Sequence, residues 1–186
     1  MKPSPILELD AHLSDRLRVA ERPGPLRSLA AFLAHSGDSW FWAIGLFALW
    51  ASGTSFWKQW GVVQFVGISA LVIVVMSIKF LVRRQRPEGE WGNIYRSTDP
   101  HSFPSGHAAR AFLIATVASG LGPSGFAAFL WGWAPLVALA RVAMGVHYVS
   151  DVVVGALLGI AFGIFVLETY QPVLMWLSNL IGLPLW

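Results

Sequence analysis

The chain has 186 residues, of which 55% are hydrophobic and only 12% are charged, and ten are tryptophan. A water-soluble domain of this size needs far more polar surface, and several apolar runs approach the roughly 20 residues that cross a bilayer core. The sequence therefore predicts an integral membrane protein. The net charge of +3 is too small to indicate nucleic-acid binding, and the lack of cysteine excludes disulfides and thiolate metal sites.

Residues 1–38 are predicted to form two short helices that lie at the membrane surface. Between residues 5 and 20, apolar side chains alternate with charged ones at loose helical spacing, which is typical of an interfacial amphipathic helix. No cleavable signal is expected, because this stretch carries acids where a signal peptide has an apolar core. Prolines 23 and 25 flank Gly24 and interrupt the chain, and a second helix over 26–35 is too short to span.

Residues 39–170 are predicted to form an all-α transmembrane bundle of about five to six spans. Trp40, Trp42 and Trp57 stand near the ends of the first expected span, where aromatic rings favour the headgroup region. The tail, 171–186, is apolar but is expected to break at Pro172 and Pro184, which suits an interfacial or partly inserted segment. The expected spans cover residues 39–57, 61–82, 105–121, 126–146 and 151–169.

Three short polar stretches interrupt the apolar sequence, each at the end of a hydrophobic run, where a charge is costly and usually functional. They are KFLVRRQRP (79–87), FPSGH (103–107) and RVAMGVHYVSD (141–151). Following the expected spans in turn, all three emerge on the same side of the bilayer. Cations bind phosphate oxygens, one imidazole can attack phosphorus, and another can protonate a leaving group. The stretches contain this whole set: Lys79, Arg86, Arg141, His107, His147 and Asp151.

The first stretch allows two interpretations. Lys79 and Arg86 are seven residues apart, so they share one face if the helix continues that far, and together they can bind phosphate oxygens. Alternatively, the whole cluster is a positively charged flank whose side chains snorkel to the interface. Arg83 and Arg84 are assigned to that flank in either case.

The second and third stretches also have a structural and a functional interpretation. Ser105, Gly106 and His107 fit a helix N-terminus, which is either an ordinary cap or an anion site with free N–H groups. His147 and Asp151 are four residues apart, so on a helix they stack, as a surface pair or as an imidazole oriented by a carboxylate. Only the joint occurrence of the three stretches, in order and on one side, favours the functional interpretation of each.

Other polar and small residues receive minor roles. Gly155, Gly159 and Gly163 form a small-residue ridge that suits helix packing within the chain better than a dimer interface, and the oligomeric state is left open. His35 and His101 are assigned no chemical role. The loop 88–102 is expected to shape a headgroup pocket, with these possible contacts: Glu88, Glu90, Tyr95, Arg96 and Asp99.

The three stretches closely resemble the signature of the type 2 phosphatidic acid phosphatase superfamily, which also includes the vanadium haloperoxidases. That signature reads K-x6-RP, PSGH and SR-x5-H-x3-D. Lys79 with Arg86–Pro87 matches the first part, Pro104–His107 the second, and Arg141, His147 and Asp151 the third. One position departs from it, since Ala140 stands where the family has Ser, which removes a hydroxyl near the expected phosphate site. The resemblance covers about residues 36–169.

The resemblance implies a metal-independent phosphatase without a cofactor, whose substrate is a lipid phosphate in the bilayer. His147 would form a phosphohistidine, Asp151 would orient it, and His107 would protonate the leaving group and then activate water. The transition-state charge would be stabilised by five groups: Lys79, Arg86, Arg141, Ser105 and Gly106.

Several alternatives stay open. The substrate could be phosphatidate, phosphatidylglycerol phosphate or an isoprenyl pyrophosphate, and the same site could transfer phosphate to another lipid. A vanadate-dependent peroxidase is disfavoured by the apolar spans, and a non-catalytic lipid-binding protein by the intact histidines. Basic residues of the N-terminal arm favour a cytoplasmic site, whereas bacterial members of the family mostly face outward; the extracytoplasmic face of a bacterial plasma membrane is preferred.

Overall fold

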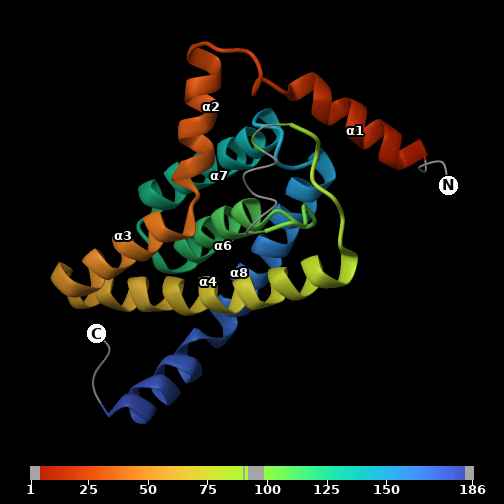
Figure 1. Ribbon diagram of the computed structural model, residues 1–186. Coiled ribbons are helices and arrows are strands. Elements are labelled where there is room, and N and C mark those ends of the chain that lie inside the picture. The colour runs from red at the N-terminus through yellow and green to blue at the C-terminus, as the bar shows by residue number, and fades with distance from the viewer. Residues whose placement is uncertain (1–4, 90, 92–98, 183–186) are drawn as a thin grey trace.

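The computed structural model describes residues 5–89, 91 and 99–182. That part of the chain is helical apart from connecting segments and an isolated β-bridge between Gln85 and His101, which confirms the predicted all-α fold (Figure 1). The helices are α1 (Pro5–Leu17), α2 (Pro25–Ser36), α3 (Ser39–Ser52), α4 (Ser55–Val82), α6 (Gly106–Leu121), α7 (Ser124–Ala143) and α8 (Val149–Ile181).

Three helices of the described chain, α4, α7 and α8, are long and apolar enough to cross a membrane. Helix α3 has 14 residues and α6 has 16, so a crossing by either stays a prediction. The first expected span, 39–57, begins where α3 begins, at Ser39, but α3 ends earlier than expected, at Ser52. Gly53 closes α3 in an extended conformation and Thr54 precedes α4, so Trp57 belongs to α4.

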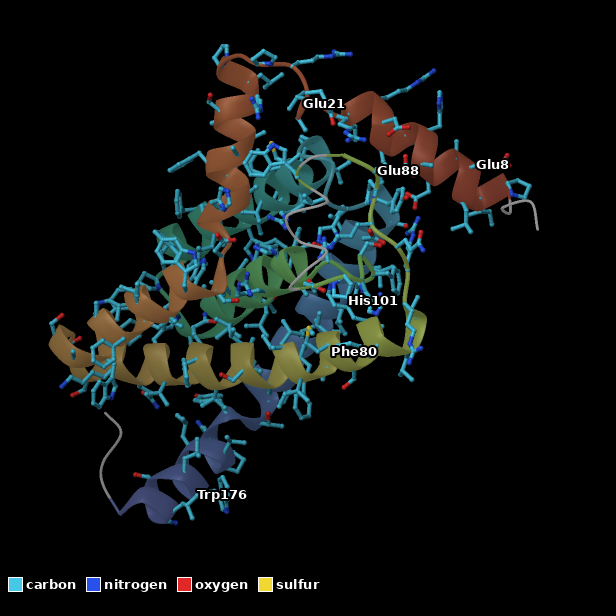
Figure 2. The ribbon with its side chains drawn as sticks, viewed as in Figure 1. Glu8, Glu21, Phe80, Glu88, His101 and Trp176 are labelled. Carbon is cyan, nitrogen blue, oxygen red and sulfur yellow. The ribbon has the colours of Figure 1, made fainter. Side chains whose placement is uncertain are left out.

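The break expected at Pro172 was wrong. Helix α8 runs for 33 residues through this proline to Ile181, so the predicted division at residue 170 does not coincide with a helix end. A proline inside a helix removes the hydrogen bond to the carbonyl four residues earlier and bends the helix without necessarily ending it. Figure 1 shows the last part of α8 leaving the bundle, and Trp176 projects from it in Figure 2. The remainder of the tail, including Pro184, lies outside the described residues.

Helix α6 lies at the centre of the bundle, between α4, α7 and α8 (Figure 1). Its alanine-rich sequence buries ten of its 16 residues, because small side chains let neighbouring helices approach closely. The glycine ridge of α8 faces it: a Cβ on Gly155 would lie 2.6 Å from the Ser105 carbonyl oxygen, and one on Gly163 would lie 2.7 Å from Thr116 Cβ. The ridge therefore packs within the chain, as predicted, and holds the start of α6 against α8.

Helix α1 docks onto the first turn of α8. Two of its polar side chains, Asp10 and Ser14, are buried. Ser14 Oγ accepts from the backbone N–H of Val149 at 3.0 Å, and Asp10 Oδ1 accepts from that of Ser150 at 3.0 Å. These bonds satisfy N–H groups that a helix start leaves unpaired. The leucines of α1 stay exposed, which fits the predicted helix at the membrane surface.

Candidate active site

A cavity of about 150 Å³ lies where α4, α6 and the link between α7 and α8 meet. The chain segments that line it come from all three polar stretches, as the shared-side prediction requires. One wall is apolar and belongs mainly to α4, including Ile68, Leu71, Val72 and Val75. The polar wall carries Lys79, Asp99, Gly106, His107, Arg110 and His147.

The two cations of the first stretch converge, but for a different reason from the one predicted. Helix α4 ends at Val82, and Arg83 adopts a left-handed conformation with φ of 54°, so Arg86 does not share a helix face with Lys79. Both side chains instead reach one carboxylate oxygen, Asp99 Oδ2, at 2.9 Å from Lys79 Nζ and 2.8 Å from an Arg86 nitrogen. This oxygen therefore lies between two cations, a position that favours an anionic oxygen.

His147 sits beside these cations and is fully buried. Its Nε2 lies 3.3 Å from an Arg86 nitrogen, which also donates to the Val146 carbonyl at 2.8 Å. Burial, followed by the positive charges of Arg86, Arg141 and Lys79, lowers the pKa of His147 well below 6.5. A neutral imidazole with a lone pair is the form that can attack phosphorus.

The expected His147–Asp151 pair is present but is not a stacked pair on one helix. His147 lies in the link before α8, and Asp151 is the third residue of that helix. His147 Nδ1 is 3.5 Å from Asp151 Oδ2, so the two groups face each other without forming a hydrogen bond, and hydrogen bonds of catalytic pairs are often long without substrate. The same oxygen accepts the Tyr148 backbone N–H at 2.9 Å, which fixes the carboxylate.

Arg84, assigned above to a positively charged flank at the interface, is in fact tied to the site, so that assignment was wrong. One of its nitrogens donates to Asp151 Oδ1 at 2.8 Å and to Ser150 Oγ at 2.7 Å, and the other to Asp10 Oδ2 at 2.7 Å. Its guanidinium also stacks 4.0 Å from the Tyr148 ring centroid. Arg84 thus connects the candidate catalytic carboxylate to α1. Sequence spacing alone did not separate it from Arg83, which bonds only locally to the Phe80 carbonyl among the contacts described.

The second stretch begins α6, as predicted. Ser105 Oγ caps the helix by accepting from the Ala108 N–H at 3.5 Å, and the residue is fully buried, so its contact with phosphate stays a prediction. Gly106 lines the cavity, and a Cβ there would meet Val75 only at an ordinary 3.6 Å. Packing within the chain does not demand glycine at this position, which leaves room for a ligand to approach the backbone.

His107 reaches a carboxylate that lies outside every stretch singled out above. Its Nε2 is 2.7 Å from Oδ1 of Asp38, in the link between α2 and α3. One helical turn further on, Arg110 is buried in α6 and bonds to Ser39 Oγ at 2.7 Å. Arg110 could have been found, because a charge inside an apolar segment is rarely incidental. No spacing rule points to Asp38.

Two further residues considered in the sequence, Arg141 and Ala140, lie near the end of α7. Arg141 is buried at the end of α7, close enough for its charge to act on both site histidines. Ala140 does not line the cavity; it packs in an apolar cluster with Ala30 and Ala34 of α2, so a hydroxyl at this position would sit among methyl groups.

His101 contributes its backbone, as expected for a residue without a chemical role. Its carbonyl accepts from Lys79 Nζ at 2.5 Å, and its ring packs edge-on against Phe80 (Figure 2). Of the possible headgroup contacts in the loop 88–102, Asp99 lies in the cavity, and the carbonyl of Glu88 accepts from Arg18. The other three, Glu90, Tyr95 and Arg96, lie outside the described residues.

Comparison with known proteins gives a consistent result. The sequence matches the PAP2 superfamily over residues 60–174. It is 32% identical to a probable lipid phosphate phosphatase beta of Arabidopsis thaliana, over 88% of this chain and 90% of that protein. It is 34% identical to a decaprenylphosphoryl-5-phosphoribose phosphatase of Mycobacterium tuberculosis, over 80% of this chain and 82% of that protein.

Solved structures agree with the observed fold. LpxE of Aquifex aeolicus aligns with a TM-score of 0.64 and 29% identity, over 87% of this chain and 94% of that one. A PAP2-type phosphatidylglycerolphosphate phosphatase of Bacillus subtilis aligns with a TM-score of 0.69 over 91% of this chain and 88% of that one, and at 23% identity it supports the fold. The chain therefore belongs to the PAP2 superfamily, and it is an integral-membrane phosphatase.

Proposed function

We propose that this protein removes a terminal phosphate from a lipid phosphate or pyrophosphate through a phosphohistidine on His147. Nε2 of His147 attacks phosphorus, and the bond from phosphorus to the leaving oxygen breaks with its electron pair passing to that oxygen. His107 supplies the proton to the leaving oxygen. Water then attacks the phosphohistidine, with His107 taking a proton from it, and phosphate is released from a neutral His147.

The observation that carries this proposal is the environment of His147. Nδ1 faces Asp151 while Nε2 faces Arg86, so the nitrogen that could attack points to where cations would bind phosphate. With Lys79 and Arg141 nearby, the negative charge that develops on the phosphate oxygens would be stabilised by groups already in place. Phosphate binding would displace the Asp99 carboxylate, since both need the same two cations.

An apolar hollow beside the site supports a substrate with a hydrocarbon tail. It has a volume of about 360 Å³ and lies between α3 and α4. It shares Ser39, Ile68 and Val72 with the polar cavity, so a headgroup at His147 would leave its tail next to this hollow. Its other lining residues are Trp42, Ala43, Leu46, Phe65 and Ser69. The names of the relatives, which act on phosphorylated lipids, favour the same substrate class.

The test is phosphate release in detergent from phosphatidate and from an isoprenyl pyrophosphate, with a chelator present, by the wild type and by His147→Ala. We expect release from at least one lipid that survives the chelator and falls by a factor on the order of 10⁴ or more in the variant, because the nucleophile is lost. Release that persists in His147→Ala would remove His147 as the nucleophile. A wild type inactive on both lipids would overturn the proposed substrate class.

Because bacterial members of the family mostly face outward, we further propose that the site faces the extracytoplasmic side of a bacterial plasma membrane. The positive charge of the N-terminal arm argues for the opposite side, and α1 does lie on the side of the site. Because the chain lacks cysteine, single cysteines can report the orientation. We expect an impermeant maleimide to label Arg22→Cys but not Gly125→Cys in intact cells. The reverse pattern would place the site in the cytoplasm.

A further inference from the structure

Asp38 stands between α2 and α3, where an aspartate would ordinarily cap the following helix. Among the described contacts, its side chain makes no capping bond to α3. Its carboxylate turns toward the site instead, with Oδ1 2.7 Å from His107 Nε2. Oδ2 lies 3.0 Å from His35 Nδ1 and accepts from Trp40 Nε1 at 3.3 Å. The carboxylate is therefore held at both oxygens, in an orientation that helix capping does not require.

The link that carries Asp38 is fastened to the helices of the site. Arg110 Nε donates to the Gly37 carbonyl at 3.0 Å, and Trp133 Nε1 of α7 donates to Ser36 Oγ at 2.9 Å. Gly37 is itself packed tightly, since a Cβ there would lie 2.8 Å from Val137 Cγ1 of α7. The bond to His107 thus comes from a backbone that is positioned by α6 and α7.

Asp38 is charged in this setting. Burial disfavours its ionised form, but the hydrogen bonds and charges of His107 and His35 outweigh burial and hold the pKa of the Asp38 carboxyl well below its usual range. The positive charges of Arg141, at the end of α7, and of Arg110, on the same helix, also act on His107. Lys79 of α4 and His147 line the same cavity. The charge of Asp38 acts on His107 in the opposite direction to these cations and opposes them in part.

We propose that Asp38 is the positioning residue of the general acid, so that each site histidine has a carboxylate of its own. The inference rests on the proposed function, in which His107 protonates the leaving oxygen. By accepting the Nε2–H, Asp38 would leave Nδ1 as the nitrogen that carries the transferable proton. It would also favour the protonated imidazole against its cationic neighbours, as a buried aspartate does for the base of a catalytic triad.

This role predicts a dependence on the leaving group, which a purely structural role does not. Phosphatidate releases an alkoxide, which needs a proton, whereas 4-nitrophenyl phosphate releases a stable anion, which does not. We expect Asp38→Asn to lower kcat for phosphatidate by about 10- to 100-fold and for the nitrophenyl ester by less than about threefold. The alkaline limb of kcat/KM for phosphatidate should move to lower pH, since a neutral amide retains the imidazolium proton less well.

The controls separate this role from folding. Asn and Ser are both favoured at helix N-termini, so Asp38→Ser also removes the carboxylate without placing an unfavourable residue before α3. It is the second variant if Asp38→Asn folds poorly. Asp15→Asn makes the same chemical change on the exposed face of α1 and should leave kcat for both substrates unchanged. In a His107→Gln background, Asp38→Asn should cost little further activity, because the group it positions is gone.

The outcomes distinguish this inference from the function on which it rests. A wild type that releases no phosphate from phosphatidate, from the isoprenyl pyrophosphate or from the nitrophenyl ester defeats the proposed function itself. If the wild type is active but Asp38→Asn and Asp38→Ser lower kcat equally for the two substrates and leave the pH profile unchanged, the role of Asp38 alone is overturned. The role of Asp38 would also be overturned if the losses of activity caused by Asp38→Asn and by His107→Gln were fully additive in the double variant.

Discussion

Arg84→Gln is expected to destabilise the protein by about 3 kcal/mol and to lower kcat on the order of 100-fold. The side chain is mostly buried and pairs with two carboxylates, Asp10 and Asp151, of which Asp151 is completely buried. Removing one partner of a buried ion pair leaves the other charge buried without compensation. This destabilises the protein by more than the intact pair stabilises it. The KM should change little, because Arg84 acts through Asp151 and does not line the cavity.

The neighbouring residue provides a matched control. Arg83→Gln makes the same change one position away, at an exposed side chain that bonds to the Phe80 carbonyl, and should alter stability by less than about 0.5 kcal/mol. Adding Asp10→Asn to Arg84→Gln should recover part of the lost stability, since one unpaired carboxylate is then neutral. Equal effects of Arg83→Gln and Arg84→Gln, measured by thermal unfolding in detergent and by phosphate release, would contradict the buried ion-pair network.

The protein should also lose stability below about pH 6.5 because of His147. The pKa of this histidine is lowered in the folded state, first by burial and then by Arg86, Arg141 and Lys79. At a pH between the pKa of His147 in the folded protein and its pKa in the unfolded chain, this histidine is protonated in the unfolded chain and neutral in the folded protein. The stability that depends on a neutral His147 is therefore complete above about pH 6.5 and declines as the pH falls, by up to about 1.4 kcal/mol per pH unit.

Comparison with His147→Gln isolates this contribution, since other groups titrate in the same range in both proteins. We expect the difference in unfolding free energy between the two proteins, measured by denaturant titration in mixed micelles, to change with pH below about 6.5 and to stay constant above it. Parallel pH profiles would mean that His147 accepts a proton in the folded state as readily as in the unfolded chain.

The site residues could be predicted from the sequence to an unequal extent. Lys79, Arg86, Arg141 and the two histidines were identified because charged groups at the ends of apolar runs are rare and because their spacing matches a known signature. The structure brings these residues around or beside one cavity. The reasoning for Lys79 and Arg86 was nevertheless wrong in detail, since a left-handed residue ends α4 and the two side chains converge through Asp99.

Asp38 and Arg84 could not be found in this way. Arg84 lies beside Arg83 and has the same composition around it, but only Arg84 meets Asp10, which is distant in the chain. Asp38 occupies a position where capping explains an aspartate equally well, and its bond to His107 spans 69 residues of sequence. Contacts of this range depend on how helices pack, which local spacing does not encode.

The sequence by itself determined the membrane setting, the all-α class and the candidate chemical groups, because hydropathy and residue type are local properties. The sequence predicted the helix ends only approximately, since α3 ends at Ser52 and α8 continues past Pro172. The tertiary structure alone decided which carboxylate faces which histidine, how α1 reaches Asp151 through Arg84, and that Asp99 lies between the two cations. These pairings arise because the alanine and glycine surfaces of α6 and α8 bring the helices close together, and so set distances between groups far apart in the chain.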